Sequence, residues 1–503
     1  MEKEKKKFYI TTALPYVNAK PHVGFAYEII CADVIARWHR LLEEDVFFLT
    51  GTDENAKKNE LAAKAAKVPI KKFVDINARA FFELCKKLNI SNDDFIRTTQ
   101  DRHTKTAQLL FKKIYDKGEI YKGTYKGFYC IGCEAFLTEK ELIDGKCPEH
   151  NTKPEFLEEE SYFFKLSKYK KEIEKALNKK GFVLPCSRQE EMLSRLKEGI
   201  RDLSVSRINQ KWGIDVPIDP EHKIYVWIDA LSNYISALDW PEGKRFERYW
   251  PADLHIIGKG ITWFHAVIWP ALLMAIGLRL PKQIFVHGYL TAEGKKISKS
   301  LGNAINPVYI VNKYGTDALR YFLVREIPFG QDGDFNEKAL KQRCNTELAD
   351  KLGNLINRIL GLTEKFFKGR LPQGRIDDQL VDQLQLSDIK KHMEKLELDK
   401  VLALIFAFID SCNLYIQEKR PWDIPWEVPP EPDSMKKISN ILYTVIDSLR
   451  VIAILLCPFM PNTAKKIAEQ LGVRLGTLND CKFGLTKATQ IKKGPILFEK
   501  IKD

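Results

Sequence analysis

Hydrophobic residues change their spacing along the first part of this 503-residue chain. Apolar and β-prone residues alternate over residues 7–12, which predicts a buried strand, whereas residues 23–42 carry apolar side chains at helical spacing. The same order recurs further along, with strands at 45–51 and 95–97 and helices that reach about residue 88 and span 101–116. Strands that alternate with helices of this length predict a parallel, doubly wound α/β sheet.

The pattern changes after residue 117. Short aromatic strands, a cysteine cluster and charged helices indicate an insertion, and the α/β pattern resumes with the apolar run 223–229. A strand at 254–258, a helix around 263–274 and a strand at Phe285 follow. Later segments are amphipathic and helical, near 338–368, 385–418 and 434–457. We therefore expect the α/β domain in two halves, 1–117 and 221–335, an insertion at 118–220, and an all-helical bundle at 336–503.

The composition of the chain indicates what kind of partner it binds and in which compartment it works. Eighty Lys plus Arg residues against 67 Asp plus Glu give a net charge of +13, which favours a polyanion such as nucleic acid. The first seven residues are mostly charged rather than an apolar leader, and the most apolar run, Val451–Met460, is too short to span a bilayer. Seven of the ten cysteines are scattered singly. These features predict a cytoplasmic protein without membrane association.

Three cysteines and a histidine form two close pairs within the insertion. Cys130 and Cys133 are separated by two residues, as are Cys147 and His150, with glycines nearby. Tetrahedral Zn²⁺ binds to pairs of this kind. Because all four positions are filled by protein side chains, the sequence predicts one structural Zn²⁺ per chain, which would fold an insertion that has little core of its own.

Two further segments suit phosphate chemistry. Gly294–Asn303 is a glycine-flanked loop with two lysines and two serines, and it follows the apolar run 284–286. Such a loop can place ammonium, hydroxyl and backbone N–H groups around a polyphosphate, although a solvated basic turn has the same composition. His22 and Gly24 lie where the first helix begins, and a helix N-terminus offers N–H groups to phosphate. Alone this pair is weak, because a helix-capping histidine is commoner.

Together these motifs resemble a known family. His-x-Gly at 22–24 and Lys-Ile-Ser-Lys-Ser at 296–300 are similar to the signature pair of class I aminoacyl-tRNA synthetases. The resemblance narrows to the methionyl-tRNA synthetase family, single-zinc variety, through runs in family order at 13–18, 48–54, 225–230, 264–265 with 269–270, 285–289 and 328–334. It covers essentially the whole chain, and it implies a Rossmann-like catalytic domain.

The resemblance implies an activity. The family joins L-methionine to ATP, forming methionyl-adenylate and pyrophosphate, and then transfers methionine to the 3′ end of tRNA(Met). It implies Mg²⁺ bound with ATP and catalytic roles for His22, Lys296 and Lys299. His22 would contact the phosphates, Gly24 would make room for adenosine, and the lysines would hold the β- and γ-phosphates, with Lys299 the most rate-critical. Phe25 and Ser298 complete the implied ATP-binding set.

Methionine recognition requires an apolar, adaptable pocket, because a thioether is only a weak hydrogen-bond acceptor. By resemblance the carboxylate of Asp53 meets the amino group of methionine, and the pocket is formed by Leu14, Tyr16, Trp227, Ala230, Tyr234, Phe264 and His265. Any one of these aromatic residues taken alone is more often part of a protein core. Their occurrence in separate family segments favours the binding role.

The helical part carries a second group of candidate residues. Asn354 and Arg358 lie four residues apart and so share a helix face, and Trp422 lies in a proline-bounded loop. Residue type alone favours surface or loop-anchoring roles. By resemblance these three positions read the anticodon of tRNA(Met), by stacking and edge contacts. No further tRNA-binding or dimerising domain is visible after the bundle, so we expect a monomer.

The chain departs from the family pattern at several positions. Phe25 replaces the usual histidine, Asn55-Ala56 replaces His-Gly, Gly260 replaces aspartate, and Ile297 replaces methionine. We expect an active but divergent enzyme, because both lysines, His22 and Asp53 persist. The alternative is a catalytically impaired paralogue that acts as a zinc-containing tRNA-binding protein.

Three other hypotheses explain less of the sequence. A synthetase for another apolar amino acid is disfavoured, because the short insertion leaves no room for an editing domain. A zinc-containing RNA-binding protein without catalysis would show no stabilisation by methionine or ATP. A nucleotidyltransferase of the same sheet family does not account for the helical bundle or the cysteine pairs.

Overall fold

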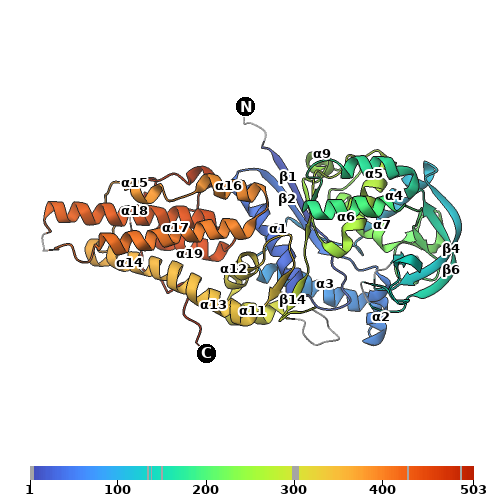
Figure 1. Ribbon diagram of the computed structural model, residues 1–503, viewed down its shortest axis with the longest axis horizontal. Coiled ribbons are helices and arrows are strands. Elements are labelled where there is room, and N and C mark those ends of the chain that lie inside the picture. The colour runs from blue at the N-terminus through green and yellow to red at the C-terminus, as the bar shows by residue number, and fades with distance from the viewer. Residues whose placement is uncertain are drawn as a thin grey trace.

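The computed structural model describes residues 5–132, 135–137, 139–148, 151–296, 305–426, 430–487 and 490–502. At its centre lies a six-stranded sheet in the order β3-β2-β1-β12-β13-β7, in which every pairing is parallel (Figure 1). Its strands are β1 (Lys7–Thr12), β2 (Asp45–Thr52), β3 (Asp94–Arg97), β7 (Val183–Leu184), β12 (Leu254–Gly258) and β13 (Ile284–His287). The predicted parallel doubly wound sheet is confirmed.

Helices cover both faces of this sheet. Side chains alternate along β1, so Phe8 and Ile10 join the core formed with α1 and α3, whereas Tyr9 joins the opposite core with α4 and α10. All residues of β1 after Lys7 are buried, as expected for a strand that is covered on both faces. The covering helices are α1 (Val23–Leu41), α2 (Lys57–Ala65), α3 (Ile70–Lys87), α4 (Asp101–Asp116) and α10 (Trp269–Ile276).

Residues in the predicted insertion form an antiparallel sheet in the order β5-β4-β6-β8 at one end of the molecule (Figure 1). Its strands are β4 (Ile120–Cys130), β5 (Ala135–Leu137), β6 (Glu155–Phe164) and β8 (Leu203–Ser204). The segment also holds β9 (Ser206–Arg207), β10 (Asp215–Val216), β11 (Asp219–Ile224), α5 (Lys170–Leu177) and α6 (Cys186–Lys197). In addition, β7 from this segment pairs with β13 and extends the central sheet.

The apolar run 223–229 is part strand and part helix. Lys223 and Ile224 end β11, and the chain then turns into α7 (Val226–Leu231), whose six residues are all buried. Periodicity cannot separate a short buried helix from a buried strand, because both are continuous apolar runs. The segments α8 (Asn233–Ser236), α9 (Lys244–Tyr249) and the π-helical turn η4 (Phe264–Ile268) follow before β13.

The rest of the chain is mainly helical and extends away from the sheet (Figure 1). It begins with β14 (Leu290–Ala292), β15 (Lys295–Lys296), α11 (Pro307–Tyr314), α12 (Thr316–Glu326) and β16 (Gly333–Phe335). The bundle consists of α13 (Glu337–Arg343), η5 (Cys344–Gly353), α14 (Asn354–Phe367), α15 (Asp378–Val381), α16 (Leu386–Glu394), α17 (Leu398–Lys419), α18 (Pro432–Leu456) and α19 (Pro461–Leu471). The expected helix at 385–418 is two helices, because Leu396 has a φ of 59° and breaks the run.

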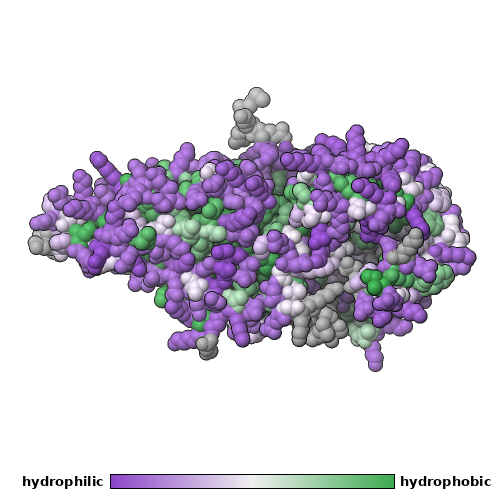
Figure 2. Space-filling view, viewed as in Figure 1, coloured by the Kyte–Doolittle hydropathy of each residue, from purple (hydrophilic) through white to green (hydrophobic). Residues whose placement is uncertain are grey.

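Two helices of the bundle, α17 and α18, are long and apolar enough to cross a membrane. The run Val451–Met460 begins in the last part of α18, so it belongs to a longer apolar helix than expected. Its most apolar window is 89% buried inside the bundle, where α18 packs against α17 and α19. Hydrophilic residues cover most of the face seen in Figure 2.

Candidate active site

The loops that carry the predicted site residues meet at one edge of the central sheet. Because β1, β2, β12 and β13 are parallel, their carboxyl ends lie together, at the point where the strand order reverses around β1. The loops after β1 and β2 also bond to each other: the N–H of Asp53 donates to the carbonyl of Pro15 at 2.9 Å, and the N–H of Val17 donates to the carbonyl of Asp53 at 3.3 Å.

His22 caps the N-terminus of α1. Its Nδ1 accepts a hydrogen bond from the N–H of Gly24 at 3.0 Å, so in the neutral ring the proton lies on Nε2, the donor that a phosphate would require. A Cβ atom at position 24 would lie only 2.8 Å from the imidazole Cε1. The spacing His-x-Gly therefore has a local physical reason: the histidine ring occupies the space that a side chain at position 24 would need.

The segment that carries the second signature, Lys-Ile-Ser-Lys-Ser, ends beside the N-terminus of α1. β15 ends at Lys296, and Ile305 accepts a hydrogen bond from the N–H of Val23 at 3.1 Å. The residues between them, which include the predicted ATP-binding Ser298 and Lys299, lie outside the described residues, and the side chain of Lys296 is not described either. The described part of the chain thus places the end of the lysine loop beside His22 and Gly24.

Three predicted methionine-binding aromatic residues lie against one another. Trp227 of α7 stacks on Phe264 of η4 with ring centroids 3.7 Å apart, and Tyr16 meets Trp227 edge-on at 6.4 Å. Leu14 packs against the same apolar core, as does Tyr16. Ala230 lies one helical turn after Trp227 and is buried. The structure therefore brings the predicted pocket residues from three separate segments into one aromatic wall.

His265 and Tyr234 form the back of this wall. Nδ1 of His265 donates to the carbonyl of Ile261 at 3.0 Å, so Nε2 accepts the hydrogen bond from the hydroxyl of Tyr234 at 2.8 Å. Burial lowers the pKa of His265 to about 4, only partly opposed by the Ile261 carbonyl. At neutral pH the ring is uncharged, which suits a pocket for an uncharged thioether.

This histidine should make folding stability depend on pH. The pKa of this imidazole is lower in the folded protein than the value of about 6.5 in the unfolded chain. The unfolded state therefore binds the proton more tightly, so folding stability is intact above pH 6.5 and decreases as the pH falls toward 4. With the folded pKa at about 4, the loss between pH 7 and pH 5 is about 2 kcal/mol. We expect His265→Gln, which can keep both hydrogen bonds, to remove this part of the slope in urea unfolding at the two pH values. An unchanged slope would contradict the buried, neutral imidazole.

Asp53 is buried, with 2% of its surface exposed, and its Oδ1 accepts a hydrogen bond from the N–H of Asn55 at 3.3 Å. Lys58, which sequence reasoning missed, places its ammonium 3.8 Å from the ring centroid of Tyr16 and donates to the carbonyl of Gly132 at 2.9 Å. Lys58 lies in the first turn of α2, shortly after Asp53, and this position in the sequence would have suggested it as a site residue.

Asn55, one of the departures from the family pattern, belongs to a buried network. Its side-chain amide donates to Asp229 at 2.8 Å, and Asp229 also bonds to Nε2 of His103 at 2.6 Å. His103 in turn contacts the hydroxyl of Ser236 at 2.9 Å. This network holds α7, and with it Trp227, against α4. Ala56, the next departure, is fully buried.

Phe25 and Gly260 are also accommodated locally, and the remaining departure, Ile297, lies outside the described residues. The ring of Phe25 packs edge-on against Phe81 of α3 at 4.9 Å, and the N–H of Phe25 donates to the carbonyl of His22 at 3.0 Å. A Cβ atom at position 260 would lie 2.3 Å from the hydroxyl of Tyr289. The tyrosine therefore occupies the space of the usual aspartate, and the nearby Lys259 pairs with Asp332 at 2.6 Å.

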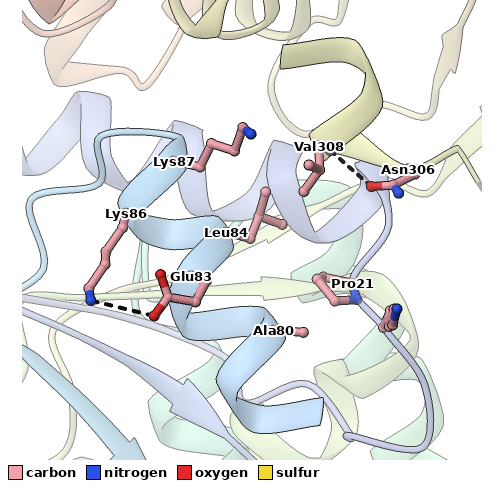
Figure 3. A pocket seen from close by; sticks show the side chains of 9 residues that line it. Pro21, Ala80, Glu83, Leu84, Lys86, Lys87, Asn306 and Val308 are labelled. Atoms are coloured by element: carbon pink, nitrogen blue, oxygen red, sulfur yellow. Dashed lines mark hydrogen bonds and ion pairs between the residues drawn. The ribbon is translucent and has the colours of Figure 1, made fainter. Parts of the chain in front are cut away.

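A cleft of about 680 Å³ lies beside this site rather than in the methionine pocket (Figure 3). Its walls come from α3, from the loop that precedes His22 and from the start of α11, and it is lined by Lys20, Pro21, Ala80, Glu83, Leu84, Lys86, Lys87, Asn306 and Val308. Three lysines against one glutamate favour anions here. Pro21 and Asn306 border the two signatures, so the cleft adjoins the phosphate end of the site.

The described part of the predicted zinc site consists of two cysteines. Cys130 ends β4 and Cys147 lies in a turn, and each is 1% exposed. Cys133 and His150 lie outside the described residues, and no group of three potential metal ligands occurs among the residues that are described. The zinc site therefore stays a prediction.

Two of the three predicted anticodon-reading residues lie together in the bundle. The guanidinium of Arg358 lies 5.8 Å from the ring centroid of Trp422, and its Nη1 is buried without a hydrogen-bond partner among the described residues. Trp422 is half-buried, and Asn354 is exposed at the start of α14. An arginine beside an aromatic ring suits stacking on an RNA base.

The sequence matches the family model "tRNA synthetases class I (M)" over residues 8–153 and 150–360. A methionine–tRNA ligase from Caldanaerobacter subterraneus subsp. tengcongensis is 46% identical over 99% of the chain and 79% of its own length, and one from Rickettsia felis is 45% identical over 93% of both. The chain belongs to the methionyl-tRNA synthetase family. The resemblance inferred from the motifs is confirmed, and the protein is an aminoacyl-tRNA synthetase, an ATP-dependent ligase.

Two further matches agree with this family. Residues 383–491 match the "Anticodon-binding domain of tRNA ligase", which falls within the helical bundle. The crystal structure of Mycobacterium tuberculosis methionyl-tRNA synthetase bound by methionyl-adenylate has a TM-score of 0.94 to this chain, with 39% identity over 98% of this chain and 100% of that chain. None of these comparisons supports the alternative of a catalytically impaired paralogue.

Proposed function

We propose that this chain activates L-methionine with ATP and transfers it to the 3′ end of tRNA(Met). A carboxylate oxygen of methionine attacks the α-phosphorus of ATP, and the bond to pyrophosphate breaks. A ribose hydroxyl of the tRNA then attacks the acyl carbon and AMP leaves. The observation that carries this proposal is the hydrogen bond from Val23 to Ile305, because it joins the lysine loop to the helix end beside the aromatic pocket.

The residues divide this chemistry between them. Nε2–H of His22, at the N-terminus of α1, would bind a phosphate oxygen, and Lys296 and Lys299 would stabilise the charge that develops on pyrophosphate. Mg²⁺ would arrive with ATP. The buried carboxylate of Asp53 would hold the methionine ammonium, and the wall of Trp227, Phe264 and Tyr16 would hold the thioether. The protein would thus act mainly by positioning its substrates and by electrostatic stabilisation.

Methionine-dependent exchange of pyrophosphate into ATP tests this proposal. The folded protein should catalyse exchange with methionine and show little exchange with leucine or isoleucine. The absence of exchange above background, from protein that is folded and binds tRNA, would overturn the catalytic role. It would favour the alternative of a zinc-containing tRNA-binding protein without catalytic activity.

Trp422→Ala should separate charging from activation. We expect the variant to charge tRNA(Met) about tenfold or more slowly at limiting tRNA, since one lost base-stacking contact costs about 1–3 kcal/mol. Pyrophosphate exchange should stay within twofold of the wild type, because Trp422 lies in the bundle and not at the sheet edge. The two assays should be run on the same preparation.

Trp426→Phe provides a matched control in the same loop. Trp426 packs against Phe366 and Phe367, so it anchors the loop within the bundle. A phenyl ring keeps most of this packing, and both activities should remain near the wild-type level. Equal loss of charging and exchange in Trp422→Ala would contradict a role confined to the anticodon.

The insertion should also carry a structural Zn²⁺ at Cys130, Cys133, Cys147 and His150. The burial of both described cysteines supports this, because a Zn²⁺-bound thiolate pair is shielded from solvent in such sites. Chelation should speed proteolysis between residues 131 and 151 before pyrophosphate exchange declines. Metal content close to zero in the folded, active protein would contradict the site.

The remaining predictions concern organisation. The catalytic halves 1–117 and 221–335, the insertion 118–220 and the anticodon-binding bundle 336–503 remain the proposed domain limits. We propose that the protein acts as a monomer in the cytoplasm. Light scattering at micromolar concentration should give the mass of one chain, and a dimer mass would contradict this proposal.

A further inference from the structure

Lys58 lies between the aromatic wall of the pocket and a turn of the insertion. Its ammonium is 3.8 Å from the ring centroid of Tyr16 and donates a hydrogen bond to the carbonyl of Gly132 at 2.9 Å. Gly132 follows the end of β4 in the cysteine turn (residues 130–132), which begins with Cys130. A single side chain therefore contacts two segments that are far apart in the sequence.

Packing alone does not enclose the ring of Tyr16. Its backbone is fixed, because Tyr16 pairs with Asp53 in a parallel bridge. The ring, however, is partly exposed and meets Trp227 edge-on, with centroids 6.4 Å apart. A cation over the face of an aromatic ring is attracted to its π-electrons, and the attraction is stronger where the cation is partly desolvated. Lys58 is half-buried, so it can fix the orientation of this ring.

The first turn of α2 directs Lys58 to this position. The next residue, Asn59, is fully buried and donates from its side-chain amide to the carbonyl of Asp53 at 3.1 Å. The residue before, Lys57, pairs with Glu60 of the same helix at 2.8 Å. Successive residues of a helix lie about 100° apart around its axis, so neighbouring side chains point in different directions. Lys57 and Lys58 therefore have the same charge and different partners.

We propose that Lys58 is a positioning residue that couples the cysteine turn to methionine binding. Its ammonium is held by Gly132 and keeps the ring of Tyr16 in the orientation that completes the aromatic wall. The turn thus contributes to the affinity for methionine, and methionine must in return stabilise the turn by the same factor. The inference rests on the proposed function, since it requires that this pocket binds methionine.

Lys58→Met tests the proposal, because it removes the charge and keeps an apolar stem. We expect the KM for methionine in pyrophosphate exchange to rise about threefold to thirtyfold, the range for one partly desolvated cation–π contact. The kcat and the KM for ATP should stay within twofold of the wild type, because the contact is the same in the ground state and the transition state. Lys58→Arg keeps a cation that can lie over a ring and donate to a carbonyl, and it should recover most of the affinity.

Two comparisons locate the contact. Lys57→Met removes the same charge one residue earlier and should leave the KM for methionine unchanged. A double-mutant cycle then tests whether Lys58 acts through the ring of Tyr16. In a Tyr16→Leu background the ring is gone, so Lys58→Met should raise the KM no further. In a Tyr16→Phe background the ring remains, and the increase should persist.

Hydrogen exchange tests the reciprocal effect on the insertion. Saturating methionine should slow the exchange of backbone amides at the end of β4 and in the cysteine turn, residues 128–132. This protection should appear in the wild type and in Lys57→Met and should be absent from Lys58→Met. A merely structural role of Lys58 would change exchange without methionine, but it would leave the response to methionine in place.

Each other outcome overturns the inference. A KM for methionine less than threefold above the wild type in Lys58→Met would show that the ammonium does not support the pocket. An equal increase in the Tyr16→Leu background would show that Lys58 does not act through this ring. Protection by methionine that persists in Lys58→Met would separate the turn from the pocket. Failure of the proposed function is distinguishable, because the wild type itself would then show neither methionine-dependent exchange of pyrophosphate nor any response to methionine.

Discussion

Lys299→Ala should slow methionine-dependent pyrophosphate exchange by about 10²–10³-fold, the largest loss of activity we expect from one substitution. Removal of one preorganised group that stabilises transition-state charge has an effect of this size. The described ends of the lysine loop support the expectation, since Lys296 ends β15 and Ile305 is bonded to the N-terminus of α1. Rapid-quench measurement of adenylate formation at saturating ATP reports this step directly.

The KM for methionine should change little in this variant, because the aromatic pocket is built from other loops. Lys299→Arg keeps a cation and should recover part of the rate, although a guanidinium does not reproduce the geometry of an ammonium. Lys338→Ala, which removes an exposed lysine of α13, is the control for overall charge. Exchange by Lys299→Ala within threefold of the wild type would refute the catalytic role.

The elements near the sheet could be predicted because local pattern and tertiary structure agree there. Residues 7–12 combine apolar residues with β-prone threonines and become β1, a strand with a parallel neighbour on each side. The run 223–229 is equally apolar but turns into α7, since a buried helix and a buried strand need the same residues. At Leu396 a left-handed backbone conformation splits one predicted helix into two, and periodicity does not report backbone dihedrals.

In the candidate site, too, some features could be predicted from the sequence and others could not. The aromatic wall could be predicted because each residue lies in a recognisable segment, and the structure brings Tyr16, Trp227 and Phe264 together. The network behind it could not, since Asn55 and His103 reach Asp229 across 174 and 126 residues of sequence. These hydrogen-bond partners meet only because α4 packs against α7, and no local pattern in the sequence indicates that packing.

The buried side chain of Arg320 connects the catalytic helix α1 with the bundle. Arg320 of α12 and Asp33 of α1 lie 2.7 Å apart, and neither side chain is exposed. The guanidinium also donates to the carbonyls of Phe459 and Pro458, in the turn between α18 and α19, and to that of Leu88 after α3. One side chain therefore joins helix α1, whose N-terminus His22 caps, to the far end of the chain.

Arg320→Met should destabilise the fold by about 3–5 kcal/mol, the cost of leaving one partner of a buried ion pair. The substitution keeps an apolar stem, so the loss comes from the missing charge and from three carbonyls without their donor. Because the lost bonds connect two parts of the chain, denaturant unfolding should separate into two transitions when helicity and tryptophan fluorescence are compared. The wild type should unfold with more closely coincident transitions.

The effect should also depend on pH in a defined direction. Burial alone would raise the pKa of Asp33, but Arg320, Arg37 and the bonds from Ser91 outweigh it and hold the pKa below its usual value. A carboxylate with a depressed folded pKa stabilises the protein above pH 4 and loses that contribution as pH falls further. Loss of Arg320 should weaken this dependence of stability on pH.

Lys391→Met provides the control for the stability measurement. It removes an exposed pair with Asp388 in the bundle and should cost less than 1 kcal/mol. A cost for Arg320→Met no larger than that control would show that Arg320 does not hold the two parts together.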